Sequence, residues 1–325
     1  MATKVKKTDG PDVSIVIAAW QAEVFLVRSI ENALGQEGVT VEVIVVDDAS
    51  TDDTFGVARA MADRDGRVTA LRLPENAGPS GARNAALAHA RGTWIAVLDA
   101  DDRMVPRRLQ RMIALAEKVG DEGRAVDIVL GNLAEVDETG QPLSDEPFIT
   151  DPDAPVRLSA ERFVAGNLRV VGGHNLGYLK PLVRRAFIER EGIAYDTDLR
   201  NGEDFHLVLC CLLAGANVWF SPDPDYLYTR RKGSVSSVST IDHLNALIRS
   251  ETDMLVHPAL TPELRELLDK RRRGLIDLRT TETVLQALRA RRIGRARAAL
   301  TARPRAAVLV LRQLSEGLWR RLLRA

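Results

Sequence analysis

Residues 93–103 read TWIAVLDADDR, an apolar run followed directly by three carboxylates. The run TWIAVL has the length and the unbroken apolar character of a buried strand. Asp99, Asp101 and Asp102 then follow within four positions. Crowded carboxylates repel one another unless a cation or hydrogen-bond donors compensate for their charge. A solvated turn is the alternative interpretation, but a turn does not need three acids directly after a core strand.

Strand and helix patterns alternate through the first half of the chain. Further apolar runs predict strands at 13–18, 41–46, 67–73 and 125–137. The three segments that connect the strands at 13–18, 41–46, 67–73 and 93–98 have helical spacing. Fully apolar strands that alternate with helices are typical of a mostly parallel sheet covered by helices on both faces. We therefore expect an α/β fold.

The second half has a less regular pattern. A loop rich in Pro, Asp and Thr is expected at 138–158. The spacing predicts helices near 159–166, 181–191 and 203–215, and short strands near 174–180, 217–220 and 225–230. After about residue 240 the chain is predicted to be helical, with a break near Gly274 or Asp277. The expected organisation is a tail at 1–12, one domain in two halves at 13–138 and 139–238, and a basic helical extension at 239–325.

The composition limits the functions that the chain can have. Its 325 residues can bury a sizeable core, and 45 basic residues balance 45 acidic ones, which gives no reason to expect a nucleic-acid partner. No apolar run predicts a membrane-spanning helix, and the basic N-terminus lacks the apolar segment of a secretory signal. Cys210 and Cys211 are adjacent and cannot form a disulfide framework, so we expect reduced thiols in a cytoplasmic protein.

The last quarter of the chain has a basic excess. Residues 241–325 carry 18 Lys and Arg against 9 Asp and Glu, and the final stretch interleaves leucines with arginines. One interpretation is a helix that packs on the domain or on a second copy, which would give a homodimer. The other is peripheral membrane contact through an interfacial helix, at the cytoplasmic face of the inner membrane.

Acidic residues follow two of the predicted strands. Asp47 and Asp48 follow 41–46, just as the acids at 99–102 follow 93–98. Ligands of an α/β sheet bind outside the carboxyl ends of its strands. Oxygen ligands suit Mg²⁺ or Mn²⁺, which take few protein carboxylates and leave positions for phosphates. Arg83 lies in a helix opened by Gly78, where free N–H groups favour phosphate. The alternatives are that the segment VDDAS at 46–50 caps a helix and that Arg83 forms a surface salt bridge.

Two later segments also carry charge where a ligand could bind. Glu203 and Asp204 open an apolar helix, either as a general base at the mouth of a cleft or as simple complements of the helix dipole. The segment TRRKGSVSS at 229–237 contains Arg231 and Lys232. It is either a solvated basic turn or a lid that covers a diphosphate and excludes water.

Five segments, taken in order, resemble the inverting family 2 glycosyltransferases of the A-type, Rossmann-like fold. They are VSIVIAAWQAE, VIVVDDASTDDT, NAGPSGARNAALAHARG, VLDADD and GEDFHL, and the resemblance covers residues 13 to about 238. The block GGHNLGYLKPLVRR followed by LRNGEDFHLVLCCLLAGA is similar to bacterial exopolysaccharide transferases of the succinoglycan-assembly kind. The resemblance implies a nucleotide-sugar-binding half at 13–138 and an acceptor-binding, catalytic-base half at 139–238. It also implies a hexose transfer from a UDP-sugar to a glycan or lipid-linked acceptor.

The resemblance implies roles at the matching positions. Asp204 would be the base of a single displacement, and Glu203 would help to position the acceptor. Asp101, with Asp99, would bind Mn²⁺ or Mg²⁺. Donor-binding roles fall to Ala18, Trp20, Glu23, Asp47, Asp48, Arg83, Asp99 and Arg231. Trp20 would stack on the base and Asp48 would hydrogen-bond it, although Ala-Ala-Trp-Gln replaces the family's usual Pro-x-Tyr-Asn. Further contacts to the acceptor or the lid fall to His174, Asp102 and Lys232.

Other classes of function fit less well. A dehydrogenase would have G-x-G-x-x-G after its first strand, where this chain has AAWQAE. A pyrophosphorylase usually has a Gly-rich basic loop at the same turn. A non-catalytic nucleotide-sugar-binding or scaffold protein of the same fold is the remaining alternative, but such a protein would not need the base.

Overall fold

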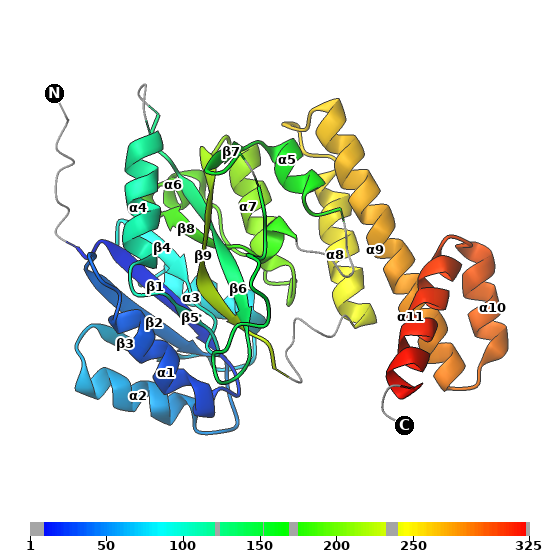
Figure 1. The fold of residues 1–325 in the computed structure, drawn as a ribbon, viewed down its shortest axis with the longest axis horizontal. Coiled ribbons are helices and arrows are strands. Elements are labelled where there is room, and N and C mark those ends of the chain that lie inside the picture. Colours follow the sequence, from blue (N-terminus) through cyan, green and yellow to red (C-terminus); the bar gives the residue numbers. More distant parts are fainter. Residues whose placement is uncertain (1–9, 121–123, 152, 169–174, 232–239, 323–325) are drawn as a thin grey trace. The chain divides into compact units, whose positions relative to one another are not determined.

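The structure is a computed structural model that describes residues 10–120, 124–151, 153–168, 175–231 and 240–322 (Figure 1). The chain divides into two compact units. The first contains the described residues up to Phe163 together with 175–231, and the second contains 164–168 and 240–322.

The first unit is built on one sheet. Its strands are β1 (Val13–Ala19), β2 (Val41–Asp47), β3 (Val68–Arg72), β4 (Trp94–Val97), β5 (Arg103–Met104), β6 (Ile128–Val136), β7 (Val156–Leu158), β8 (Lys180–Arg184) and β9 (Val218–Thr229). In the described part of the chain the sheet has nine strands in the order β3-β2-β1-β4-β8-β6-β9-β5, and β7 also pairs with β9. β8, β5 and β7 run antiparallel to their neighbours, and the other strands share one direction, as predicted.

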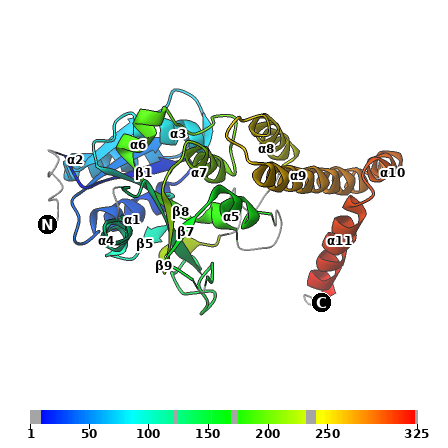
Figure 2. The same cartoon turned by 90° about the horizontal axis from the view of Figure 1, so that it is seen from above.

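Helices cover both faces of this sheet. α1 (Glu23–Leu34) and α4 (Arg108–Val119) lie on one face, and α3 (Gly78–Leu87), α6 (Arg185–Glu191) and α7 (Glu203–Leu213) lie on the other (Figure 2). α2 (Thr54–Arg64) packs against α1. Every residue of β2 and nearly every residue of β1 is buried, which explains why these strands are mostly apolar.

The register of the central strands brings the acidic segments to one edge. Ala19 at the end of β1 pairs with Asp47 at the end of β2. On the other side of β1, Val16 pairs with Val97 at the end of β4. The residues that follow β2 and β4 therefore emerge at the same edge of the sheet, which is where ligands of parallel sheets bind.

Three predictions for residues 174–230 are wrong in detail. Residues 181–184 form part of β8 rather than a helix, because this segment pairs with both β4 and β6; the helix begins at Arg185. The strand predicted near 174–180 is replaced, after residue 174, by a 3₁₀ turn at Leu176–Tyr178. The two strands predicted near 217–220 and 225–230 are one strand, β9. Pro222 and Pro224 lie between its two stretches paired with β6, because proline has no N–H to donate to a ladder.

The second unit is helical, as expected. It contains α8 (Ile241–Met254), α9 (Pro262–Arg289), α10 (Ile293–Ala302) and α11 (Ala306–Leu322). α9 continues through Gly274 and Asp277, so the predicted break is wrong. Leu275 and Leu278 of α9 are buried with α8, and burial of each leucine stabilises by roughly 1.5–3 kcal/mol. This exceeds the cost of about 1 kcal/mol for a glycine inside a helix.

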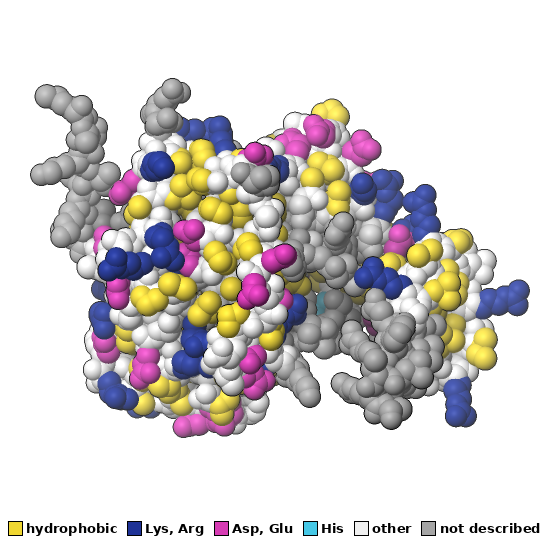
Figure 3. All heavy atoms as spheres, in the orientation of Figure 1, with side chains coloured by type: hydrophobic (Ala, Val, Ile, Leu, Met, Phe, Trp, Pro, Cys, Tyr) yellow, Lys and Arg dark blue, Asp and Glu magenta, His cyan; other side chains and the backbone are white. Residues whose placement is uncertain are grey.

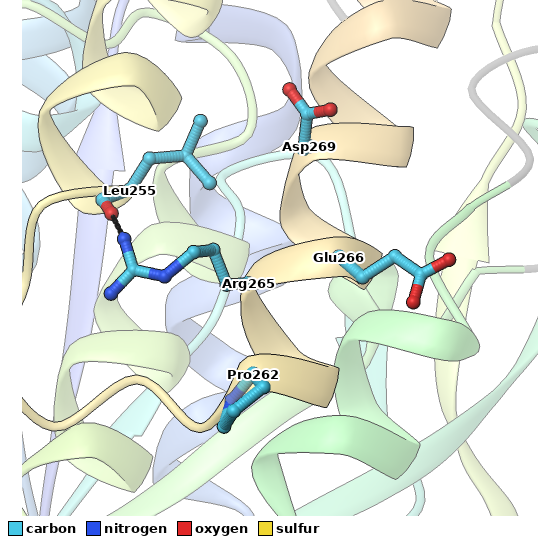
Figure 4. Close-up of a pocket in the computed structure, with 5 residues that line it drawn as sticks. All are labelled: Leu255, Pro262, Arg265, Glu266 and Asp269. Atoms are coloured by element: carbon cyan, nitrogen blue, oxygen red, sulfur yellow. Dashed lines mark hydrogen bonds between the residues drawn. The ribbon is translucent and has the colours of Figure 1, made fainter.

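A pocket opens at the surface of the helical unit. An open pocket of about 400 Å³ lies where α8 ends and α9 begins, lined by Leu255, Pro262, Arg265, Glu266 and Asp269. Arg265 reaches from α9 to the carbonyl of Leu255 (Figure 4). None of the residues singled out from the sequence lines this pocket. No helix of the described ranges combines the length and apolar character needed to cross a bilayer.

One buried ion pair joins the far strands of the sheet to α4. The guanidinium of Arg108, which begins α4, contacts Asp225 of β9 and donates to the backbone carbonyls of Asn132 and Lys180, each at 3.1 Å. Arg108 and Asp225 are both almost fully buried. Four elements therefore meet at one charge.

We predict that Asp225→Ala lowers the free energy of unfolding by about 3–5 kcal/mol, because it leaves a buried guanidinium without its main carboxylate. Asp223→Ala is the matched control. Asp223 is 55% exposed and 3.6 Å from Arg111, so its loss should cost less than about 1 kcal/mol. Urea unfolding followed by circular dichroism measures both changes. Equal changes for the two variants would contradict the prediction.

Candidate active site

Arg83 is a buried cation that three carboxylates surround. It is 3% exposed and lies in the middle of α3. Its Nη1 atom lies 2.5 Å from Glu203 Oε1 and 3.3 Å from Asp204 Oδ1, and its Nη2 atom lies 2.8 Å from Asp99 Oδ1. Residues predicted from three distant segments therefore meet around one guanidinium. The resemblance places Arg83 near the donor diphosphate, whereas here its terminal nitrogens face carboxylates.

Lys180 is a second buried cation, and the sequence analysis missed it. Its Nζ atom lies 2.8 Å from Asp99 Oδ2 and 3.1 Å from Asp204 Oδ2. Lys180 begins β8, in the segment that was predicted to pass from strand to helix at about this position. The available signal was a single lysine inside the otherwise apolar run YLKPLV. Buried lysines are rare unless they are paired, so this position needed a carboxylate partner.

Opposite charges in this cluster stabilise the ionised forms of Asp99 and Lys180. Burial opposes ionisation of Asp99, but Lys180 and Arg83 outweigh it and lower its pKa to about 2. Burial also opposes the charge of Lys180, yet Asp204 and Asp99 raise its pKa well above the ordinary value. For Glu203 burial dominates and raises the pKa, although Arg83 acts in the opposite direction. Asp99 and Lys180 are therefore both charged near neutral pH.

Two buried tyrosines support the carboxylates. The hydroxyl of Tyr195 donates to Asp204 Oδ1 at 3.3 Å. The hydroxyl of Tyr226 accepts the N–H of Asp99 at 3.0 Å and donates to Asp102 Oδ2 at 2.8 Å. Burial raises the pKa of both tyrosines well above the ordinary value, so both keep their protons. The sequence analysis singled out neither residue, because a lone tyrosine carries no local signal of such a contact.

The DADD turn divides its carboxylates between the interior and the surface. Asp102 is 1% exposed and accepts the N–H of Thr229 at 2.7 Å in addition to the Tyr226 hydroxyl. Burial, together with the charges of Asp99 and Asp101, raises the pKa of Asp102 well above its usual range. Asp101 is partly exposed, and its Oδ2 atom lies 2.5 Å from Arg231 Nε. Asp102 therefore binds groups in the interior of the protein, whereas Asp101 lies nearer to solvent.

The carboxylates that follow β2 are also buried. Asp48 accepts the N–H of Ala77 at 2.7 Å and that of Gly78 at 2.9 Å, so it fixes the start of α3. Burial raises the pKa of Asp48, and these two donors oppose the rise. Asp47 has no exposed surface, and its Oδ2 atom lies 3.2 Å from Arg72 Nε.

The end of β1 is followed by an exposed aromatic side chain. Ala18 is partly buried, and the side chain of Trp20 is 52% exposed. Glu23 Oε2 accepts the N–H of Asp53 at 2.8 Å, which ties the start of α1 to the turn before α2. His174 and Lys232, which were predicted to contact the acceptor or to belong to a lid, lie outside the described residues.

Comparison with known proteins gives a direct match to one family. The model of the family described as "Glycosyl transferase family 2" matches residues 14–186. The chain is 38% identical over 317 residues to "Succinoglycan biosynthesis protein ExoO" of Rhizobium meliloti, covering 97% of this chain and 87% of that protein. It is 34% identical over 269 residues to "Succinoglycan biosynthesis protein ExoU" of the same organism, covering 82% and 76%.

Solved structures share the fold. S. aureus TarS 1-349 in complex with UDP-GlcNAc aligns with a TM-score of 0.62 at 17% identity, covering 90% of this chain and 92% of that one. Mannosyltransferase PcManGT from Pyrobaculum calidifontis, in complex with GDP-Man and Mn²⁺, aligns with a TM-score of 0.57 at 20% identity, covering 95% and 81%. At these identities the likeness shows the A-type fold alone. The family model and the two sequence relatives establish more: this chain belongs to glycosyl transferase family 2.

Proposed function

We propose that this protein is an inverting hexosyltransferase of bacterial polysaccharide synthesis. It would move a hexose from a nucleoside-diphosphate sugar, most simply a UDP-sugar, to a hydroxyl of a glycan or a lipid-linked oligosaccharide. The observation that carries this proposal is the convergence of Asp99, Glu203 and Asp204 on two buried cations beside the carboxyl edge of the sheet. The two relatives named for succinoglycan biosynthesis support the pathway class, and the TarS complex with UDP-GlcNAc supports the donor class.

The donor would bind along the edge formed by the ends of β1, β2 and β4. Trp20 offers an exposed ring on which a nucleotide base can stack. Asp48, fixed by two backbone donors, would hydrogen-bond the base, with Ala18, Glu23 and Asp47 supporting the same edge. Arg83 is buried among three carboxylates, whereas Arg231 is partly exposed and pairs with Asp101. We therefore assign the diphosphate contact to Arg231 and Lys232 of the basic segment instead. Arg83 would then orient the acidic groups.

Asp204 would act as the base of a single displacement. As the acceptor hydroxyl attacks the anomeric carbon, Asp204 takes its proton, and the bond between that carbon and the diphosphate oxygen breaks. Attack from the face opposite the leaving group inverts the anomeric centre. Tyr195 and Lys180 both contact Asp204 and limit its orientation. Glu203 and His174 would help to position the acceptor, and Asp102 would act by holding the DADD turn.

The acidic turn would hold a divalent ion that is shared with the donor. In the described ranges no three His, Cys, Asp or Glu side chains gather to hold an ion. Mg²⁺ commonly uses only one or two carboxylates and completes its shell with water and substrate phosphates. We propose that Asp101, with Asp99, holds Mg²⁺ or Mn²⁺ in this way, as the Mn²⁺ of the PcManGT complex suggests. Such an ion would neutralise charge on the leaving diphosphate.

The proposal also assigns a role to each part of the chain. Residues 13–138 would bind the donor, and residues 139–238 would bind the acceptor and supply the base. The enzyme would act at the cytoplasmic face of the inner membrane, where lipid-linked acceptors are found. Residues 239–325 would then provide peripheral membrane contact, with a homodimer as the alternative.

We predict that Asp204→Asn lowers kcat by about 10²–10⁴-fold, because the amide cannot accept the proton of the acceptor hydroxyl. Binding of the donor should change only a few-fold. Asp198→Asn, an exposed acid six residues earlier, is the control and should retain activity. Transfer from a panel of UDP-sugars measures kcat, and calorimetry measures donor binding. A wild-type chain that binds donors but neither transfers nor hydrolyses them would favour the non-catalytic alternative.

Lys180→Met tests the second cation as a positioning residue. We expect kcat to fall by about 100-fold and the KM of the donor to rise by a smaller factor, because Asp204 and Asp99 each lose one of the groups that orient them. Lys180→Arg keeps the charge and should recover part of the rate. A lysine needed only for stability would lower Tm in the methionine variant and leave kcat unchanged well below that temperature.

Removal of the metal gives a separate prediction. UDP should bind tightly in the presence of Mn²⁺ and weakly after EDTA, and Asp101→Asn should bind weakly under both conditions. Asp153→Asn is an exposed control that should behave like the unaltered protein. Calorimetric titration of UDP measures all six cases. Equal affinity with and without EDTA would contradict a metal shared with the donor.

A further inference from the structure

Charge is sharply segregated within the helical extension. Residues 241–282 carry seven basic and eight acidic residues, whereas residues 283–325 carry eleven arginines and one acid, Glu316. The stretch 283–315 contains eight arginines and neither Asp nor Glu. α8 and most of α9 are therefore close to neutral, and the end of α9, α10 and α11 form a strongly basic hairpin. We call residues 284–312 the basic hairpin.

The basic hairpin also exposes aliphatic side chains. Its internal core consists of Val284, Leu285, Ala287, Ala296 and Val310, which pack α10 and α11 onto the end of α9. Ile293 is 71% exposed, Val308 is 70% exposed and Leu311 is 67% exposed. In the space-filling view hydrophobic side chains gather over α10 and α11, and basic side chains project around them (Figure 3). Because the core already anchors both helices, the exposed aliphatics are not needed to hold the hairpin together.

The combination of charge and aliphatic exposure discriminates among partners. A second copy of the chain would bring the same arginines face to face across a two-fold axis, where they would repel. A nucleic acid would use the arginines but leave the aliphatics without a role. An anionic lipid surface uses both, because arginines attract the headgroups while aliphatic side chains insert between them.

We propose that the basic hairpin, with Ile293, Val308 and Leu311 as inserting side chains and Arg295, Arg297 and Arg305 as headgroup contacts, docks the protein on an anionic bilayer. These three arginines are exposed. The inference rests on the proposed function only in that a lipid-linked acceptor would lie at such a surface. Under this proposal residues 239–325 bind a lipid surface rather than a second copy of the chain.

Vesicle co-sedimentation of the full chain tests this proposal. The probes are vesicles of phosphatidylcholine alone and vesicles containing about one third phosphatidylglycerol. We expect binding to the anionic vesicles only, weakened by salt. Each basic residue near an anionic surface contributes roughly a fivefold factor in affinity, so a variant with Arg295→Gln, Arg297→Gln and Arg305→Gln should bind roughly 100-fold more weakly. A variant with Ile293→Ser, Val308→Ser and Leu311→Ser should also lose binding.

Matched controls keep the outcomes separate. A variant with Arg59→Gln, Arg64→Gln and Arg157→Gln loses three exposed arginines from the other unit and should bind as the unaltered protein does. Asp204→Asn should also bind normally, so a failed reaction leaves the docking result intact. Circular dichroism confirms that each variant is folded. Three results would overturn the proposal: no sedimentation with anionic vesicles, equal loss in the arginine control, or a dimer by light scattering that the serine variant converts to monomer.

Discussion

A guanidinium removed from water must be neutralised where it is buried, and Arg83 imposes this requirement on the first unit. Its partners come from the end of β4 and from the first turn of α7, on either side of a long stretch of chain. Removing one partner of a buried pair typically costs about 3–5 kcal/mol, which is a large part of a protein's stability. The contacts that keep α3, β4 and α7 together are therefore the same contacts that assemble the acidic site.

Lys180 and the two tyrosines make this arrangement more rigid. Asp99 is held by both cations through its side chain and by Tyr226 through its backbone N–H. Asp204 contacts Arg83, Lys180 and Tyr195. With several partners each, these carboxylates have few alternative orientations. Such preorganisation is what a base and a donor site need, since misplacement by about 1 Å can cost two orders of magnitude in rate.

The sequence predicted the features that depend on local periodicity and on a general rule of sheets. The apolar runs identified β1 to β4 and β6, and the rule that ligands bind at carboxyl ends brought together Asp48 and the acids after β4. Lys180 was missed because its partners lie far away along the chain and its own segment was assigned partly to a helix. That segment becomes a strand only through β4 and β6, which no local pattern reveals. The prediction at Gly274 failed for a related reason. The glycine indicated a break in the helix, but the packing of α8 on α9 keeps the helix continuous there.

The geometry of β9 constrains how this chain can change over evolutionary time. Three residues of this one strand make the contacts: Asp225 pairs with Arg108, and the Tyr226 hydroxyl and the Thr229 backbone N–H both donate to the carboxylate of Asp102. Side chains alternate between faces along a strand, so one inserted or deleted residue between Asp225 and Thr229 would turn every later side chain to the wrong face. This segment can therefore not accept changes in length. Length variation among descendants should instead accumulate in loops that carry no such register.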